Sequence, residues 1–143
     1  MNEPGVRAGR RLGRRERLTS RREFAALFRR GRRGGDNVVR VLVGPNGLAH
    51  PRMACAVPKR FGNAPKRNRL RRLYKEAFRM EKERLPAGYD LLLSPPRGSG
   101  IPGLAALREA LVAQATRTVA RLEQQRAREA QQRERRSEEQ PGG

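Results

Sequence analysis

The sequence predicts a single small α+β domain in which helices pack on one β-sheet. Apolar residues recur at helical spacing in residues 20–31, 63–85 and 104–122. Short β-branched or alternating apolar runs lie between these segments, in residues 38–43, 52–57 and 89–93. The order of helix, two or three strands, helix, strand and helix is typical of an α+β fold with one small sheet.

The first helix is predicted to begin at Ser20. Ser20 and Glu23 have the spacing of a capping box, in which the hydroxyl accepts from the Glu23 amide and the carboxylate bonds back to the helix start. Gly31 is a suitable C-terminal cap, and the Gly/Arg stretch through Gly35 is expected to be loop. One face carries the apolar residues Phe24, Leu27 and Phe28. Core packing is the expected role of the two phenylalanines, and stacking on nucleic-acid bases is the alternative.

Two strands are predicted next, from Val38 to Val43 and from Arg52 to Val57. The segment Gly44–Gly47 between them contains the Asn-Gly pair of a tight reversal. In the second run, Met53, Cys55 and Val57 alternate with small alanines, which fits a strand closely covered on one side. The two strands are therefore expected to be antiparallel neighbours.

A second helix is predicted from Asn63, which can cap it, to about Leu85, with Pro65 tolerated in the first turn. The apolar stripe that should dock on the sheet consists of Leu70, Leu73, Tyr74, Ala77 and Phe78. The opposite face consists of Asn68, Arg72, Lys75 and Arg79, with Arg69 and Arg71 on its shoulders. The exposed face is thus a basic band at helical spacing.

The remainder contains one strand and one helix. Residues 86–88 (PAG) end the second helix, residues 89–93 form a buried strand, and the loop after it runs to about Gly103. A third amphipathic helix is predicted from Leu104 to Leu122. The domain therefore spans residues 17–122. Residues 1–16 are expected to be a disordered basic arm, and residues 123–143 a charged tail that is disordered or a frayed helix.

The charge of the chain predicts a polyanionic partner. The chain contains 34 Lys and Arg against 14 Asp and Glu, a net charge of +20. Residues 1–80 hold 23 basic and 5 acidic side chains, and no carboxylate lies between Asp36 and Glu76. Lys and Arg that neutralise phosphates supply most of the affinity of nucleic-acid binders. The first half of the chain is therefore expected to bind nucleic acid.

Other features narrow the setting and the partner. A single cysteine excludes an internal disulfide, no apolar run is long enough to span a bilayer, and the N-terminus lacks a secretory signal, so we expect a cytoplasmic protein.

The basic second helix is not typical of a helix that reads DNA. Such a helix needs a partner helix and side chains that read base edges, whereas the second helix follows a strand and has Asn68 alone. Lys66, Arg67 and Arg69 instead crowd a helix start, where phosphate binds well. RNA is the expected partner, rather than DNA or a membrane.

No catalytic or metal-binding set of side chains is predicted. His50 is expected to be an exposed loop residue, and Cys55 a buried structural thiol. Carboxylate pairs such as Glu81 and Glu83 occur among solvated charges, far from the basic segment. The protein itself is therefore expected to supply no catalytic residues and no metal ligands.

Residues 59–64 (KRFGNA) followed by residues 67–73 (RNRLRRL) resemble the bacterial ribonuclease P protein component, whose hallmark is the RNR motif. Order and spacing also agree at Arg17-Leu18, Phe24, Phe28, Gly31 and Tyr89-Asp90, so the resemblance covers about residues 16–122. It implies an αβββαβα fold with a left-handed βαβ crossover, as in the second domain of ribosomal protein S5. It also implies an accessory role in an RNA-catalysed endonuclease that removes the 5′ leader of precursor tRNA.

The resemblance also implies roles for individual residues. The catalytic RNA would be bound by Lys59, Arg60, Lys66, Arg67, Asn68, Arg69, Arg71, Arg72 and Lys75. The single-stranded leader would lie in a cleft formed by Arg17, Phe24 and Phe28. The partners would be the ribonuclease P RNA and precursor tRNA, with Mg²⁺ bound through the RNA subunit and none bound by the protein alone.

Three positions depart from the family pattern. Pro65 replaces an aliphatic residue, Pro58 replaces a common serine, and the strand over residues 38–43 has no aromatic side chain for stacking on the leader.

Two other functions are alternatives. A ribosomal or general RNA-chaperone protein would share the charge and the tails, but its binding should not discriminate between RNAs. A metal-dependent protein nuclease is the second alternative, and it would have to cleave without RNA.

Overall fold

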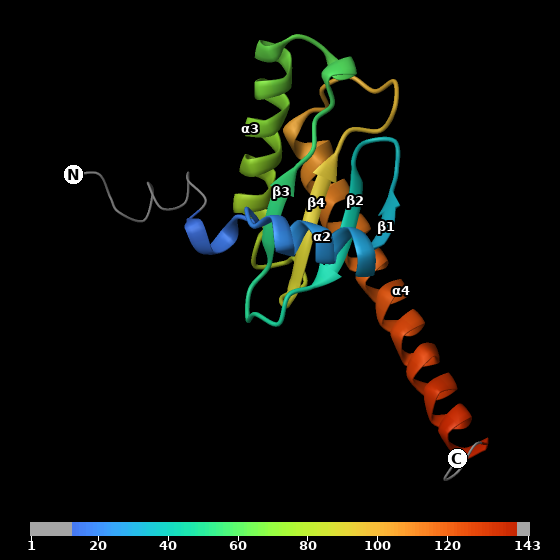
Figure 1. Cartoon of the computed structure of the whole chain (residues 1–143). Helices are drawn as coiled ribbons and strands as arrows, with labels where there is room; N and C mark the ends of the chain where they lie inside the picture. Colours follow the sequence, from blue (N-terminus) through green and yellow to red (C-terminus); the bar gives the residue numbers. More distant parts are fainter. Residues whose placement is uncertain (1–12, 140–143) are drawn as a thin grey trace.

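The computed structural model describes residues 13–139 and confirms the α+β class (Figure 1). The order of the larger elements is αβββαβα, as the resemblance implies. Two 3₁₀ turns, η1 (Arg14–Glu16) and η2 (Lys59–Phe61), precede the first and second helices. The helices are α2 (Arg21–Arg30), α3 (Ala64–Glu81) and α4 (Leu104–Glu139), and the strands are β1 (Arg32–Gly35), β2 (Arg40–Pro45), β3 (Arg52–Cys55) and β4 (Tyr89–Ser94).

The sheet has four strands in the order β1-β2-β4-β3, and only β3 and β4 are parallel. The prediction that residues 38–43 and 52–57 are neighbours is therefore wrong, because β4 lies between β2 and β3. Leu91 and Leu93 are fully buried and Leu92 is nearly so, which suits a central strand covered on both faces. The segment after β2 is not a tight hairpin. The backbone N–H of Asn46 donates to the carbonyl of Gly88 at 2.9 Å, so the chain still runs beside the start of β4 after β2 ends, and residues 46–51 then lead to β3 on the far side of β4.

The two faces of the sheet bury two apolar clusters. Helices α3 and α4 cover one face and form the larger cluster with Val41, Val43, Leu91 and Leu93. Helix α2 crosses the other face, where Leu27 packs with Leu18, Leu42 and Leu92. Because side chains alternate along each strand, they form a larger apolar layer under α3 and α4 and a smaller one under α2. We call the face covered by α2 the thin side of the sheet, and α2 is the only helix of the described chain on it.

Strand β1 corrects the expectation of a loop through Gly35. Arg32–Gly35 pairs antiparallel with β2, with Gly34 opposite Val41. A Cβ on Gly34 would clash with the Thr118 hydroxyl oxygen, so the absence of a side chain allows α4 to pack directly on this strand. The Gly/Arg composition gave no strand signal because tertiary contact with α4, rather than propensity, forms β1.

The predicted start of the first helix at Ser20 is confirmed, but half of its capping box and the predicted end of the second helix are not. The Ser20 hydroxyl accepts from the Glu23 amide at 3.4 Å, but the Glu23 carboxylate binds Arg52 rather than the helix start. Helix α3 ends at Glu81 instead of about Leu85, and the following turn brings Leu85 into the core. Glu81 is itself buried and forms ion pairs with Arg84 and Arg108, which tie this end of α3 to α4.

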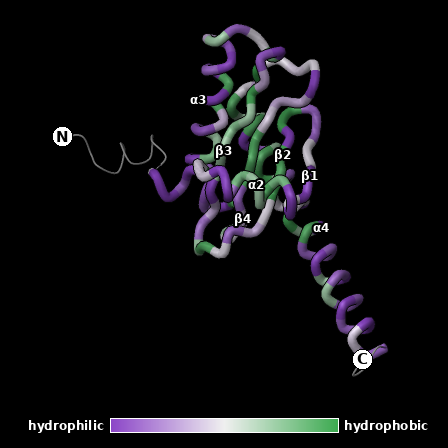
Figure 2. The backbone as a smooth tube through the Cα atoms, viewed as in Figure 1, coloured by the Kyte–Doolittle hydropathy of each residue, from purple (hydrophilic) through white to green (hydrophobic). Residues whose placement is uncertain are grey.

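Within the described residues, both flanks of the predicted domain contain helical structure. Residues 14–16 form η1, because Glu16 accepts from the Gly13 amide and pairs with Lys82 at 2.7 Å. The expected disordered arm is thus corrected at its end, and residues 1–12 lie outside the described residues. Helix α4 continues to Glu139, although none of its side chains after Leu122 is buried, and this last part of the helix is mostly hydrophilic (Figure 2). None of the helices in residues 13–139 is long and apolar enough to cross a membrane.

Candidate nucleic-acid interface

The first turns of α3 present a basic face to solvent. Asn68, Arg69, Arg72 and Lys75 are exposed, whereas Leu70 on the other side is fully buried against the sheet. The Asn63 side chain caps the helix by accepting from the Lys66 amide at 3.0 Å, as predicted. The apolar stripe and the cap together fix which side chains of α3 face outward.

Two of the predicted RNA-binding residues also hold this helix start in place. Arg67 is half-buried, and its Nε donates to the carbonyl oxygen of Gly62 at 3.1 Å. The Lys66 ammonium lies over the Phe61 ring, 5.0 Å from its centroid, in cation–π geometry. These two residues shape the loop before α3, and the more exposed Arg69 and Arg72 are freer to meet a ligand.

The basic face has no internal counter-charge. Among the ion pairs of residues 13–139, none includes a basic side chain from Lys59 to Lys75. The nearest acid in the sequence, Glu76, pairs with Arg79. The helix start adds partial positive charge and unpaired amide donors. An anion bound here would satisfy both the guanidinium groups and the helix terminus.

A groove runs beside this face, between α3 and the N-terminal part of α2. It has a volume of about 240 Å³, and we call it the α2–α3 groove. Its charged and aromatic lining residues are Arg17, Phe24, Arg71 and Lys75, and Met53, Ala54 and Cys55 of β3 form its floor. The structure therefore brings two residues assigned to the leader cleft together with two assigned to the catalytic RNA.

A short backbone pairing places Arg17 at this groove. The Leu18 amide donates to the carbonyl of Met53 at 3.0 Å, and the Leu18 side chain is buried under α2. Arg17 and Met53 form an isolated parallel bridge, so residues 17–18 run along the free edge of β3. This pairing leaves the Arg17 side chain exposed at the groove rim.

A second basic pocket lies over the part of the sheet that α2 leaves open. Arg40, Arg60 and Arg97 line it with Ala56, Pro58 and Ser94, and its volume is about 570 Å³. Arg40 pairs with Ser94 at one end of the sheet, and strand alternation puts both on the same face as Leu42 and Leu92. We call this the arginine pocket. It extends the basic surface from α3 across the open end of the sheet.

Arg40 and Arg97 are not among the residues predicted from the sequence to bind RNA. Arg40 stands between Val39 and Val41 in an apolar run, so alternation alone could have shown that it points away from the main core. Arg97 follows two prolines after β4, and nothing in its local sequence marks it. Its position over the sheet depends on β4 being central, which the predicted strand order did not include.

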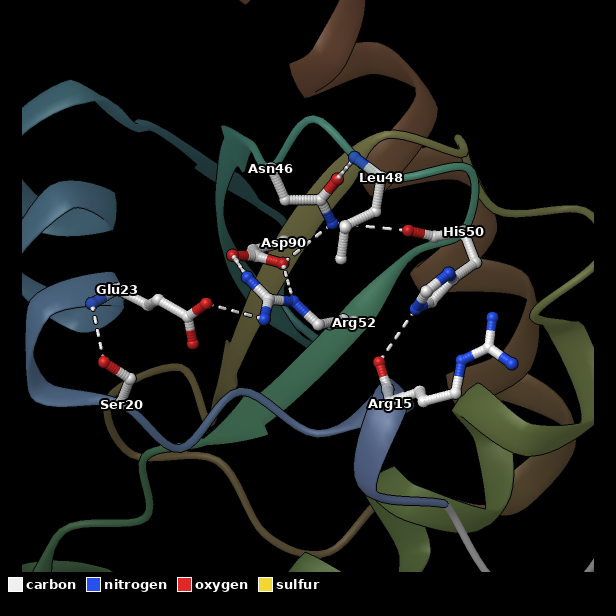
Figure 3. Close-up of polar contacts among 8 residues, drawn as sticks. All are labelled: Arg15, Ser20, Glu23, Asn46, Leu48, His50, Arg52 and Asp90. Atoms are coloured by element: carbon white, nitrogen blue, oxygen red, sulfur yellow. Dashed lines mark hydrogen bonds and ion pairs between the residues drawn. The ribbon is translucent and has the colours of Figure 1, made fainter.

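The orientation of α2 decides where its phenylalanines face. On one side of α2, Glu23 pairs with Arg52 at the Asp90 end of the sheet (Figure 3). Helical spacing puts Phe24 and Phe28 on the other side, toward the end that contains Arg40. Phe24 is half-buried and packs on the Leu27 cluster, whereas Phe28 is 54% exposed and does not line the α2–α3 groove.

A network of polar contacts fixes α2 on the sheet. Arg52 of β3 donates from Nε and Nη2 to the two oxygens of Asp90 at 2.9 Å each, and from Nη1 to Glu23 at 2.8 Å (Figure 3). The side-chain Nδ2 of Asn46 also donates to Asp90, at 2.9 Å. The hydrogen bond to Asp90, followed by the one to Glu23, raises the pKa of Arg52 despite its burial. The network therefore joins three elements around one charged side chain.

The two residues with nucleophile or base chemistry have structural surroundings. Burial raises the pKa of the Cys55 thiol to about 11, so the thiol is protonated at neutral pH. His50 is half-buried rather than exposed, and its Nε2 lies 2.8 Å from the carbonyl oxygen of Arg15 (Figure 3). Within residues 13–139, no three His, Cys, Asp or Glu side chains gather in a way that could hold a metal ion.

Comparisons with known proteins agree on one family. The ribonuclease P family profile matches residues 12–129. The ribonuclease P protein component of Thermotoga maritima is 39% identical over 82 residues, which are 57% of this chain and 70% of that protein. That of Petrotoga mobilis is 36% identical over 87 residues, or 61% and 74% of the two chains. The solved RNase P protein from Thermotoga maritima superposes with a TM-score of 0.63 at 31% identity, covering 68% of this chain and 93% of that one.

Proposed function

The chain belongs to the ribonuclease P protein component family, and from this premise we propose that it binds both the catalytic RNA and the 5′ leader of precursor tRNA. The protein would then promote removal of the leader as an accessory subunit, while the RNA supplies the catalytic groups. The observation that carries the proposal is the uncompensated basic face of α3, which continues into the α2–α3 groove and the arginine pocket.

The catalytic RNA is assigned to the α3 face. Arg69 and Arg72 point outward without carboxylate partners among the described residues, and Lys59 and Arg60 of η2 are exposed beside the helix start. Arginine forms bidentate contacts with phosphate, so this arrangement suits an RNA backbone read by shape and charge. Arg67 would act partly by holding the loop before α3 in place.

The leader is assigned to the thin side of the sheet. A single strand that enters between Arg17 and Lys75 would pass Phe24 and reach Arg40, Arg60 and Arg97 at the open end. The phenylalanines of α2 face this path, so the exposed ring of Phe28 is free to stack on a base. This path needs no aromatic residue on β2, because arginines flank it where the strand offers none.

Mg²⁺ is assigned to the RNA side of the complex. Mg²⁺ prefers carboxylate, carbonyl and phosphate oxygens, and it usually keeps several waters. The charged side chains that line the proposed path are all cationic, and no carboxylate lines either pocket, which does not fit such an ion. We therefore assign the ion to the catalytic RNA and substrate phosphates. The basic face would lower the repulsion between these two polyanions.

Reconstitution with the catalytic RNA tests the proposal. The purified chain is expected to allow that RNA to cleave precursor tRNA at Mg²⁺ concentrations where the RNA alone is nearly inactive. It should also bind a precursor with a leader more tightly than mature tRNA when the catalytic RNA is present. Equal cleavage with and without the chain would contradict the proposal.

A general RNA-binding protein would give a different result. It would stimulate unrelated RNA reactions as well as leader removal, and it would bind precursor and mature tRNA equally. An unrelated ribozyme assayed under the same conditions is the control for this alternative. Cleavage by the protein without any RNA would instead indicate a protein nuclease.

A further inference from the structure

The last part of α4 forms a second surface with α2. This part, residues 123–139, is the α4 extension, and at about 1.5 Å per residue it reaches roughly 25 Å beyond the core. Two contacts fix its direction at the start. Tyr89 Oη donates to Glu123 at 2.7 Å, and Arg32 Nη1 donates to Gln125 at 2.9 Å. The extension therefore leaves the domain at a defined angle beside the C-terminal end of α2 (Figure 1).

A groove of about 650 Å³ lies between the α4 extension and α2. We call it the α2–α4 groove. Its charged lining residues are Arg29, Arg30, Arg126, Glu129 and Arg133. Four guanidinium groups therefore face a single carboxylate. In the described chain, none of these four arginines forms an ion pair.

The fold creates this charge, because the sequence of the extension is neutral. Residues 123–139 contain five arginines and five glutamates. The side toward α2 carries Arg126 and Arg133 with Glu129, and α2 adds Arg29 and Arg30, so the groove has a net charge of +3. The other glutamates of the extension do not line it. A polar helix with nothing to bury is also stabilised little by the domain itself, so a ligand along this side would contribute to its stability.

We propose that the α2–α4 groove binds a phosphate backbone of the catalytic RNA. The proposal rests on the proposed function, since it takes the same RNA as the partner. The groove lies at the Pro45 end of the sheet, whereas Arg40 and Ser94 mark the opposite end, about 17 to 20 Å away along the strands. The arginine pocket, where the proposed leader path ends, lies at that opposite end. An RNA that reaches both ends must extend across the domain, which fits the folded catalytic RNA rather than the single-stranded leader.

Paired arginines on opposite sides of the same helix give a matched experiment. Arg126→Gln with Arg133→Gln removes two groove charges. Arg128→Gln with Arg135→Gln has the same spacing and the same charge change, but these residues do not line the groove. Binding of the full chain to the catalytic RNA is measured against salt concentration. The groove variant should have a slope of log K against log salt that is shallower by about 1.4 to 1.8 units, and the control should match the wild type within a few tenths.

Further measurements distinguish the different ways in which the proposal could be wrong. Equal slopes for the groove variant and its control would overturn the proposal. If the groove variant instead loses affinity only for precursor tRNA, or only self-association in sedimentation, the proposal for the catalytic RNA is wrong. The variant Arg69→Gln with Arg72→Gln on α3 is titrated in parallel. If the α3 variant has a shallower salt slope and the groove variant has the wild-type slope, the inference about the groove is wrong and the proposed function is still supported.

Discussion

Arg52 and Asp90 form a two-pronged ion pair between the neighbouring parallel strands β3 and β4, with both hydrogen bonds at 2.9 Å. The two side chains are only 13% and 7% exposed. The third donor group of Arg52 reaches Glu23 on α2. One guanidinium therefore holds the sheet together and orients the helix whose phenylalanines face the proposed leader path.

Removal of Arg52 should strongly destabilise the domain. Arg52→Ala leaves Asp90 buried without its charged partner, and breaking such a pair costs about 3 to 5 kcal/mol. Urea denaturation followed by circular dichroism measures this loss. Glu23→Gln is the matched comparison, because Glu23 is 39% exposed and should contribute about 1 kcal/mol or less. Similar losses for the two variants would contradict this account of the network.

Acid should weaken the link between α3 and α4. The hydrogen bond from Arg108 lowers the pKa of Glu81 in the folded state, despite burial. The ion pairs of Glu81 therefore stabilise the fold fully at pH values above the pKa that Glu81 has in the unfolded chain, about 4.3. This contribution is lost as the pH falls through the lower folded value. Urea unfolding of wild type and Glu81→Gln from pH 7 to pH 3 should show a smaller pH dependence in the variant, and equal curves would show that Glu81 does not contribute.

Exposed and half-buried arginines of α3 should behave differently. Arg69→Gln with Arg72→Gln should reduce the salt slope of catalytic-RNA binding by about 1 to 2 units and leave stability unchanged. Arg67→Ala should also lower the melting temperature, because it loses the hydrogen bond to Gly62. Binding titrations and thermal melts on the same preparations check both. An unchanged salt slope for the double variant would mean that these arginines do not contact phosphates.

The two phenylalanines of α2 allow stacking to be separated from packing. Phe28→Ala should leave stability nearly unchanged, because the ring is 54% exposed. Phe24→Ala should lower both stability and affinity for a leader-containing precursor. If either ring stacks on a base, the loss is about 1 to 3 kcal/mol for that base. The difference between the affinities for precursor and mature tRNA gives the contribution of the leader to binding. An equal loss of affinity for both RNAs would rule out leader stacking.

Cys55 should report on occupation of the α2–α3 groove. Because burial raises its pKa from 9.0 to about 11, the thiolate fraction at pH 8 falls on the order of 100-fold. Alkylation by iodoacetamide, followed by mass spectrometry, should be slow by about that factor relative to an unfolded control. Precursor tRNA bound with the catalytic RNA should slow it further, whereas mature tRNA should not. Protection by both RNAs alike would argue against a leader in this groove.

Local signals in the sequence predicted the parts of the fold that depend on local chemistry. The Asn63 cap and the apolar stripe of α3 are set by neighbours within a few residues, and both are confirmed. The strand order could not be predicted in the same way, because Asn46 and Gly47 fit a hairpin as well as they fit a crossing over β4. Strand β1 was missed because the contact between Gly34 and Thr118 joins distant segments.

The candidate interface shows the same division. The basic residues of α3 follow one another at helical spacing, so the sequence alone predicts that they share one face. Arg40, Arg60 and Arg97 come from three separate segments and meet only because β4 enters between β2 and β3. The α2–α4 groove could not be predicted from charge counts, because residues 123–139 have no net charge. The basic groove forms only where Arg126 and Arg133 lie beside Arg29 and Arg30 of α2.

The central place of β4 also sets an order of events during synthesis. In the described chain, β3 is paired within the sheet only to β4, and β4 is the last strand to be made. At roughly 5–20 residues per second, the end of β3 is made about 2 to 8 seconds, and the end of α3 about 0.7 to 2.6 seconds, before that strand is complete. The basic segment is therefore synthesised before the strand that completes the sheet on which α3 packs. A nascent chain can attract RNA by charge at that stage, but it acquires the aligned surface only once residues 89–94 are inserted.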